Sequence, residues 1–139
     1  MSKIKSILTV MALMPCCAFA ESFLISTPNT SLVLEGEKEA RLTIAYYGER
    51  LTDSEVTQVG NSGGDLHSQA YPAFGFGYNP ESALSVLHPN GELALQLVLK
   101  SCQRIDEKDY ELVTFVLKDK KHPFQVELKY KAYKKNDVI

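Results

Sequence analysis

Short runs of apolar and β-branched residues, separated by turn residues, recur along the chain from residue 21 onward. They predict strands at Phe23–Ser26, Ser31–Glu35, Arg41–Tyr47, Leu93–Leu99, Tyr110–Leu117 and Phe124–Tyr133. The last run alternates, with Phe124, Val126, Leu128 and Tyr130 on one side and charged or amide side chains on the other. Such alternation is typical of a sheet that has one face buried and the other in water.

The segments between these runs favour antiparallel pairing. The segment His88–Glu92 contains an Asn-Gly pair, which accepts positive φ, and Asp106–Asp109 is a polar turn, so both predict hairpins. Only Asp53–Val59 has a helical pattern, in which Asp53 would cap a single turn. Strands at near-regular spacing, without amphipathic helices between them, predict an all-β protein built as an antiparallel β-sandwich.

The segment from Gly60 to Pro80 follows neither period and is rich in glycine and aromatic residues. About twenty residues without a period is long for a loop in a compact domain, and such loops commonly line a site or lie against a partner. The residues predicted to face a substrate or partner are Tyr71, Phe74, Phe76, Tyr78 and Asn79. The alternative is that the aromatic rings close one end of the sandwich core, which is the expected place for Phe74.

The first twenty residues predict an export signal. Lys3 and Lys5 precede a short apolar run, and Ala18-Phe19-Ala20 has the small-x-small pattern that signal peptidase cleaves. We therefore expect residues 1–20 to be a signal peptide and residues 21–139 to form one partial sandwich domain. The mature protein would then be periplasmic or secreted.

The cysteines do not predict a disulfide. A lipid anchor on Cys16 or Cys17 is less favoured, because Pro15 and Cys16 respectively occupy the position that needs a small residue. Cys102 follows an apolar strand, which predicts a small buried core residue in preference to a nucleophile.

The apolar run of the signal is shorter than the roughly 20 residues that cross a bilayer, and no later run approaches that length.

Charge and composition narrow the choice of partners. Without residues 1–20 the chain keeps 13 basic and 17 acidic side chains, a formal charge of −4, which does not favour nucleic acid or anionic lipid. The chain contains no tryptophan, the residue on which sugar-binding clefts commonly stack pyranose rings. The bulk composition is that of an ordinary globular protein and names no function.

Few residues suggest chemistry. The loops that carry His67, His88 and His122 share no metal-ligand spacing, so the sequence predicts no metal site. Gly63-Gly64 lacks the residues of a phosphate-binding loop, so no nucleotide cofactor is expected. The acids of Asp106–Asp109 fit a solvated turn better than a calcium loop. No acid stands in an apolar stretch that would raise its pKa for glycoside hydrolysis.

Several segments, taken in order, match a known family. They are Phe23–Leu34, Tyr46-Tyr47-Gly48 with Leu51, Tyr71–Gly75, Ala83–Gly91, Leu117–Asp119, Pro123–Tyr133 and Asp137–Ile139. Together they resemble the N-terminal domain of family 36 glycoside hydrolases, the bacterial α-galactosidases. The resemblance rests on the number, order and spacing of these motifs, and it covers essentially all of the chain after the signal.

The resemblance implies a large β-supersandwich of which this chain is the first part. In that family a (β/α)8 barrel follows, which holds both catalytic aspartates, and then a C-terminal sheet. The family's nucleophile lies in a Lys-Trp-Asp type motif, so no catalytic residue is carried over to a chain without tryptophan. The family's N-terminal domain also helps tetramer assembly and can lend a Gly-Asp-Phe-Arg loop to a neighbouring active site. Here the matching stretch, Gly77–Glu81, lacks the aspartate and the arginine.

Two hypotheses follow. The first is a non-catalytic N-terminal domain fragment of an exported α-galactosidase, whose partners would be the missing barrel portion or further copies of the chain. The alternative is a free-standing periplasmic β-sandwich module that binds a carbohydrate, such as a galactoside, or a protein through the aromatic loop. A half-sandwich with open strand edges would be poorly soluble alone, whereas a free-standing module would unfold cooperatively as a monomer.

Overall fold

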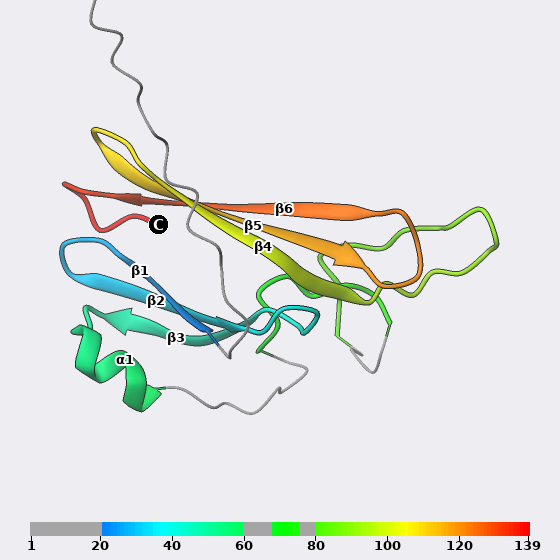
Figure 1. Cartoon of the computed structure of the whole chain (residues 1–139), viewed down its shortest axis with the longest axis horizontal. Coiled ribbons are helices and arrows are strands. Elements are labelled where there is room, and N and C mark those ends of the chain that lie inside the picture. The colour runs from blue at the N-terminus through cyan, green and yellow to red at the C-terminus, as the bar shows by residue number, and fades with distance from the viewer. Residues whose placement is uncertain (1–20, 60–67, 76–79) are drawn as a thin grey trace, which may run out of the picture.

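The computed structural model describes residues 21–59, 68–75 and 80–139. Two three-stranded antiparallel sheets lie face to face (Figure 1). The first sheet contains β1 (Glu21–Ser26), β2 (Thr30–Gly36) and β3 (Thr43–Glu49), in that order. The second contains β4 (Leu97–Asp106), β5 (Tyr110–Asp119) and β6 (Gln125–Tyr133), also in chain order. The predicted all-β, antiparallel sandwich is confirmed.

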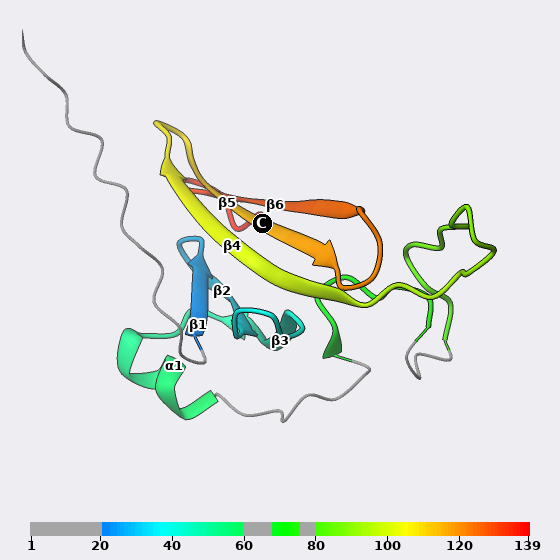
Figure 2. The ribbon, with the colours of Figure 1, turned by 45° about the vertical axis from the view of Figure 1, so that its right-hand side comes forward.

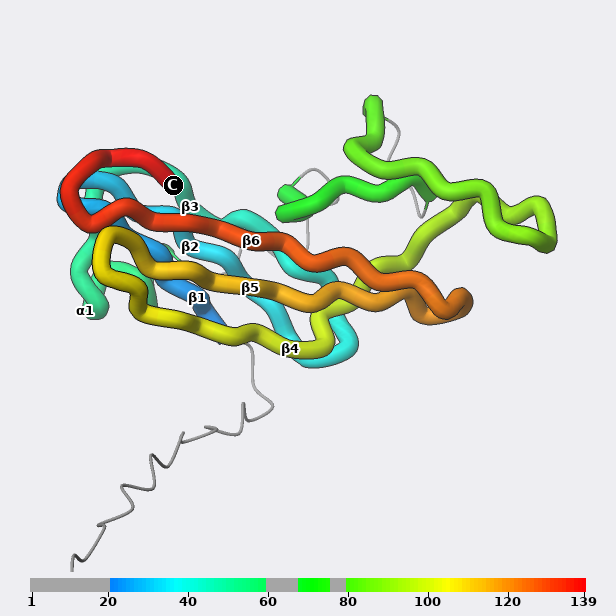
Figure 3. Tube along the Cα trace, turned by 90° about the horizontal axis from the view of Figure 1, so that it is seen from above, coloured from blue at the N-terminus to red at the C-terminus, as the bar shows by residue number. Residues whose placement is uncertain are grey.

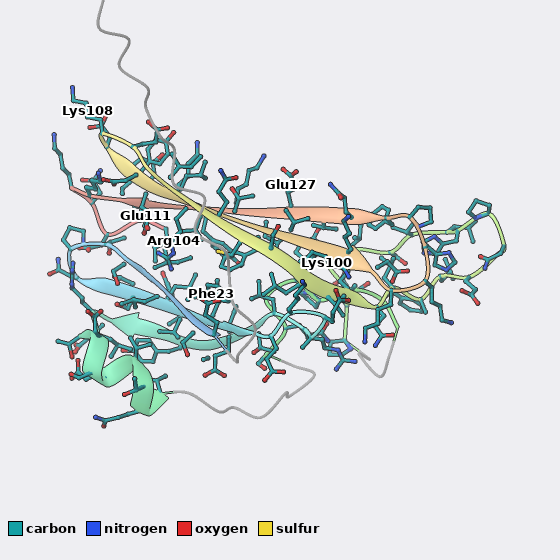
Figure 4. The ribbon with its side chains drawn as sticks, viewed as in Figure 1. Phe23, Lys100, Arg104, Lys108, Glu111 and Glu127 are labelled. Atoms are coloured by element: carbon teal, nitrogen blue, oxygen red, sulfur yellow. The ribbon has the colours of Figure 1, made fainter. Side chains whose placement is uncertain are left out.

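The core is the apolar layer between the two sheets. In the first sheet Phe23 is paired with Leu34 across the β1–β2 ladder, and both side chains face this layer. From the second sheet Phe115 enters it fully buried and meets the Phe23 ring edge-on, with ring centroids 5.0 Å apart. Figure 4 shows Phe23 between the sheets. Cys102 is half-buried and packs against the same core, which agrees with the structural interpretation of that residue.

A short helix, α1 (Asp53–Val59), covers the outer face of the first sheet (Figures 1 and 2). Strand alternation points Val33 of β2 away from the core, toward the outer face of the first sheet. Its side chain is nevertheless fully buried. Val56 is the buried residue of α1. No helix among the described residues is long and apolar enough to cross a membrane.

The helix is where the sequence predicts it, but its cap is Thr52 and not Asp53. The carboxylate of Glu55 accepts hydrogen bonds from the N–H of Thr52 at 2.8 Å and from its hydroxyl at 2.7 Å. In return the N–H of Glu55 donates to the Thr52 carbonyl at 3.0 Å. These bonds from Thr52 hold the pKa of Glu55 below its usual range. The arrangement satisfies backbone groups at the start of the helix that would otherwise lack partners.

Strand β3 begins at Thr43, two residues later than the sequence predicts. The chain before it crosses to the second sheet, where the N–H of Glu39 donates to the Leu99 carbonyl at 3.0 Å. The N–H of Leu99 donates in turn to the Ala40 carbonyl at 2.8 Å. Glu39 has a positive φ of 66°, and its carboxylate pairs with Lys100. These contacts hold the segment outside the first sheet, so strand pairing starts only afterwards.

Strand β4 begins at Leu97, four residues later than the sequence predicts. The N–H of Gln96 donates at 2.6 Å to the side-chain carboxylate of Asp119, the last residue of β5, and not to a backbone carbonyl of that strand. The N–H of Leu95 donates to the carbonyl of Phe74 at 2.9 Å, outside either sheet. The apolar residues before β4 therefore do not extend the strand, because their backbone N–H groups bond to the Phe74 carbonyl and the Asp119 side chain and not to a strand backbone.

The hairpin predicted at His88–Glu92 is a turn without flanking strands. The N–H of His88 donates to the carbonyl of Glu92 at 2.9 Å, and Gly91 has the positive φ, 83°, that its Asn-Gly pair predicts. The residues on either side form no strand in the described part of the chain. Residues 80–96, here called the extension, instead project beyond one end of the sandwich (Figures 1 and 3).

The second predicted hairpin, at Asp106–Asp109, is confirmed between β4 and β5. The N–H of Glu107 donates to the carbonyl of Tyr110 at 2.9 Å and closes the turn. Lys134 pairs with the Asp106 carboxylate at 2.6 Å, and Lys108 points outward at the tip (Figure 4). The acids of this turn thus lie in water beside a lysine, as the sequence predicts.

One bond network ties the end of the chain to the first sheet. The carboxylate of Asp137 accepts hydrogen bonds from the backbone N–H of Asn29 at 2.7 Å and from its side-chain amide at 2.8 Å. The Thr27 hydroxyl donates a third bond at 3.0 Å. The side chain and backbone of Asn29, with Thr27, hold the pKa of Asp137 below its usual range. The chain beyond β6 is thereby fixed to the β1–β2 turn.

We expect Asp137→Asn to lower the midpoint of thermal unfolding at neutral pH. Because the folded carboxyl has the lower pKa, its contribution is fully present above the ordinary value of 3.8. That contribution is lost as the pH falls through the folded pKa. The variant should therefore also show a weaker loss of stability in acid than the parent, in thermal melts taken across the acid range. Asn136→Ala, at an exposed neighbouring position, is the control; identical pH dependence in parent and Asp137→Asn would contradict this role.

Candidate functional site

Of the five residues predicted to face a substrate or partner, the structure describes Tyr71 and Phe74. The other three, which lie outside the described residues, are Phe76, Tyr78 and Asn79. Tyr71 is half-buried and packs against the core. Phe74 is 44% exposed, so the expectation that it closes one end of the core is wrong. Its neighbour Ala73, 4% exposed, belongs to the core cluster in its place.

The backbone around Phe74 explains why its ring stays at the surface. Its N–H donates to the Leu84 carbonyl at 3.0 Å, and its carbonyl accepts the N–H of Leu95 at 2.9 Å. Gly75 follows with φ 109°, and a Cβ at this position would lie 2.7 Å from the Cβ of Ala94. Only glycine fits this conformation and this close approach. The segment is therefore held between two parts of the extension, with Ala73 turned inward and Phe74 outward.

The extension also carries exposed apolar side chains. Leu87 is 70% exposed and Leu93 is 44% exposed. Single exposed apolar residues are ordinary on a protein surface, whereas apolar residues that form a contiguous patch mark contacts with another domain or protein.

A polar cluster lies where the extension meets the turn between β5 and β6. It consists of His88, Glu92, Asp119 and His122 and is here called the histidine cluster. The rings of His88 and His122 stack, with centroids 3.6 Å apart and planes at 15°. The Nε2 atom of His122 lies 2.9 Å from a carboxylate oxygen of Glu92. This cluster could not be predicted from the sequence, because its members come from two turns without a common ligand spacing.

Asp119 organises the β5–β6 turn. Its carboxylate accepts backbone N–H bonds from Gln96 at 2.6 Å, His122 at 2.8 Å and Lys121 at 3.1 Å. Burial alone would raise the pKa of Asp119, but these donors outweigh burial and keep the pKa below its usual range. At 8% exposed, Asp119 is therefore a buried carboxylate that remains ionised.

Every carboxyl group whose pKa is shifted, among the described residues, has a pKa below its usual range. In the described part of the chain the lowered pKa values belong to Glu39, Glu55, Glu92, Asp119 and Asp137. A general acid of glycoside hydrolysis needs the opposite, a raised pKa that keeps it protonated near neutral pH. These five groups therefore do not suit that role.

An open depression lies beside α1. It is lined by Leu24, Ser26, Arg50, Leu51, Thr52 and Asp53. The guanidinium of Arg50 donates a hydrogen bond to the Thr27 carbonyl in the β1–β2 turn at 2.8 Å. This bond ties the Arg50 side chain to that turn. Neither Tyr71 nor Phe74 is among the lining residues, so the depression is separate from the predicted aromatic site.

Two antiparallel sheets packed over one apolar layer define the class of the chain, an all-β sandwich domain. The family model described as "Glycosyl hydrolase family 36 N-terminal domain" matches residues 40–139. The chain therefore belongs to the N-terminal domain family of glycoside hydrolase family 36. The resemblance predicted from the sequence motifs is confirmed.

Solved structures of α-galactosidases share the fold. AgaA from Geobacillus stearothermophilus, in complex with 1-deoxygalactonojirimycin, is 20% identical with a TM-score of 0.69, over 83% of this chain and 20% of that chain. The galactosidase domain of the α-galactosidase-sucrose kinase AgaSK is 22% identical with a TM-score of 0.70, over 87% of this chain and 22% of that one. The α-galactosidase from Lactobacillus brevis is 17% identical with a TM-score of 0.62, over 82% of this chain and 20% of that chain.

The chain thus spans about a fifth of the length of these structures. At such identities the similarity establishes the fold alone. No curated protein matches the chain.

Proposed function

We propose that this chain is the non-catalytic N-terminal domain of an exported family 36 α-galactosidase, an enzyme that hydrolyses terminal α-galactosides. The observation that carries the proposal is the family match over residues 40–139. It is supported by the names of the similar structures, which are α-galactosidases several times longer than this chain.

The sandwich offers surfaces through which such a domain would contact a catalytic barrel. Strand β3 is an edge of the first sheet, and beyond it the described residues add one bridge, between Thr43 and Gln69. Tyr47 of β3 is 68% exposed and Ile44 is 37% exposed. Exposed strand edges readily accept a further strand. Together with the apolar side chains of the extension, this edge is our candidate for the contact with the rest of the enzyme.

Export is the second part of the proposal. The basic start, the apolar run and Ala18-Phe19-Ala20 support cleavage after Ala20 and a periplasmic or secreted enzyme. Mass spectrometry of the protein from the source cells should find Glu21 as its first residue. A chain that keeps residues 1–20 and stays in the cytoplasmic fraction would refute export.

The catalytic part of the proposal is tested by assay. The purified chain should release no p-nitrophenol from p-nitrophenyl α-galactoside above the rate in buffer. The DNA after the codon of Ile139 should encode, in frame or frame-shifted, a barrel with a Lys-Trp-Asp type motif. Hydrolysis by the chain alone would overturn the non-catalytic role, and a gene region without any barrel would favour a different function.

That different function is a free-standing module that binds a galactoside or a protein. The observation in its favour is the exposed ring of Phe74, held by backbone bonds on both sides. Aromatic rings supply stacking surface for sugars, although phenylalanine offers less of it than tryptophan. Calorimetric titration against a panel of galactosides tests the idea, with Phe74→Ala as the variant. Binding that this variant abolishes would support the module, and a parent chain that binds no galactoside would dismiss galactoside recognition.

A further inference from the structure

The histidine cluster brings together three side chains that share the chemistry of a metal site. The ligand atoms of His88, Asp119 and His122 all lie within 4.8 Å of one another. Two imidazoles and a carboxylate are a common ligand set for zinc, which binds nitrogen and oxygen at about 2.0–2.2 Å. All three residues lie at the junction of the extension with the β5–β6 turn, so they come from two separate parts of the fold.

His88 supplies the strongest argument for a ligand at this cluster. The residue is 6% exposed, and its Nε2 atom is buried without a hydrogen-bond partner in the part of the chain that the structure describes. A buried polar atom without a partner is costly, and such atoms are uncommon in native proteins. The lone pair of a neutral imidazole nitrogen is also a preferred metal ligand. A bound cation at this point would satisfy the atom.

Asp119 supplies negative charge in a fixed position. Its three backbone donors orient it, while a carboxylate has about four lone-pair positions, so one remains for a cation. Glu92 adds a second carboxylate, 2.9 Å from the Nε2 atom of His122. Carboxylates that contact a ligating histidine commonly orient its ring and raise its basicity.

We propose that His88, His122 and Asp119 bind a divalent transition-metal ion, best matched by zinc, and that this ion fastens the extension to the β5–β6 turn. Atoms around a tetrahedral zinc ion lie roughly 3.3 Å apart, so ligand atoms that lie within 4.8 Å of one another would have to close any excess over that spacing. Of the two histidines, His122 has the more exposed side chain, at 16%, and lies in a turn, so it is the one that would make this adjustment. Zinc would replace the stacked contact of the two rings with a shared bond to the metal.

The test is zinc binding to the protein purified without a histidine tag, measured by competition with a colorimetric zinc chelator. We expect one zinc ion per chain and a higher midpoint of thermal unfolding when zinc is present. Cobalt in place of zinc should give visible absorption bands of a tetrahedral site. His88→Gln and His122→Gln should each weaken zinc binding by at least about tenfold. Cys102→Ser is the matched control for adventitious thiol binding and should bind zinc as the parent does.

Two results would overturn the proposal. A parent protein that takes no zinc from the chelator would show that the two histidines form a stacked pair only. Unchanged zinc binding in His122→Gln would show an adventitious site elsewhere on the surface. If His88→Gln does not fold, His122→Gln decides the outcome, because its ring is partly exposed and its loss leaves the core intact.

Discussion

Phe115→Ala is expected to lower the free energy of unfolding by about 3–5 kcal/mol. The Phe115 ring is fully buried and contacts Phe23 from the first sheet and Tyr130 from β6, with centroids 5.0 and 6.0 Å away. Truncation would remove the aromatic contacts that join the two layers and leave a cavity between them. A domain of this size has about 5–15 kcal/mol of stability in total, so the variant would be marginally folded.

Urea unfolding followed by far-ultraviolet circular dichroism measures this loss. Tyr47→Ala is the matched control, because its ring is 68% exposed, and it should change the free energy of unfolding by less than about 0.5 kcal/mol. Equal effects of the two variants would show that Phe115 does not join the two sheets as described.

Asp119→Ala should be the next most damaging change, with a loss of about 2–3 kcal/mol. Three backbone N–H groups, those of Gln96, Lys121 and His122, would lose their acceptor at once. These bonds are part-buried, and leaving desolvated donors without partners costs more than the net value of the bonds themselves. The turn after β5 and the start of β4 would both loosen.

The same urea series tests this prediction in zinc-free buffer. Glu127→Ala is the control: this carboxylate lies on the wet face of β6, pairs with Lys129 at 3.0 Å, and should contribute less than about 0.5 kcal/mol (Figure 4). A midpoint for Asp119→Ala that matches that of Glu127→Ala would refute the anchoring role of the carboxylate.

Much of the sandwich could be predicted because it follows from local pattern. In β6 the alternation of Val126, Leu128 and Tyr130 with charged neighbours is the signature of a half-buried strand, and the structure buries that side. The polar turn before Tyr110 and the short helix after Leu51 could also be predicted from local pattern. The family could be recognised because the number, order and spacing of its motifs are kept along the chain, and the family match over residues 40–139 confirms it.

The remaining features depend on contacts between distant segments. The late start of β4 arises because Gln96 bonds to Asp119, a side chain that reaches it from another strand end. Phe74 is exposed because Leu84 and Leu95 fix its backbone, which no local pattern reveals. The histidine cluster was missed for the same reason, since His88 and His122 meet only in the folded chain.

The role of this domain in an enzyme is decided by one comparison. The polypeptide encoded after residue 139 should be produced with and without residues 21–139, and each preparation assayed for hydrolysis of p-nitrophenyl α-galactoside. We predict hydrolysis when the domain is present, attached or added, and loss of activity or of soluble protein when it is absent. Equal activity in both preparations would contradict the proposal that this sandwich completes an α-galactosidase.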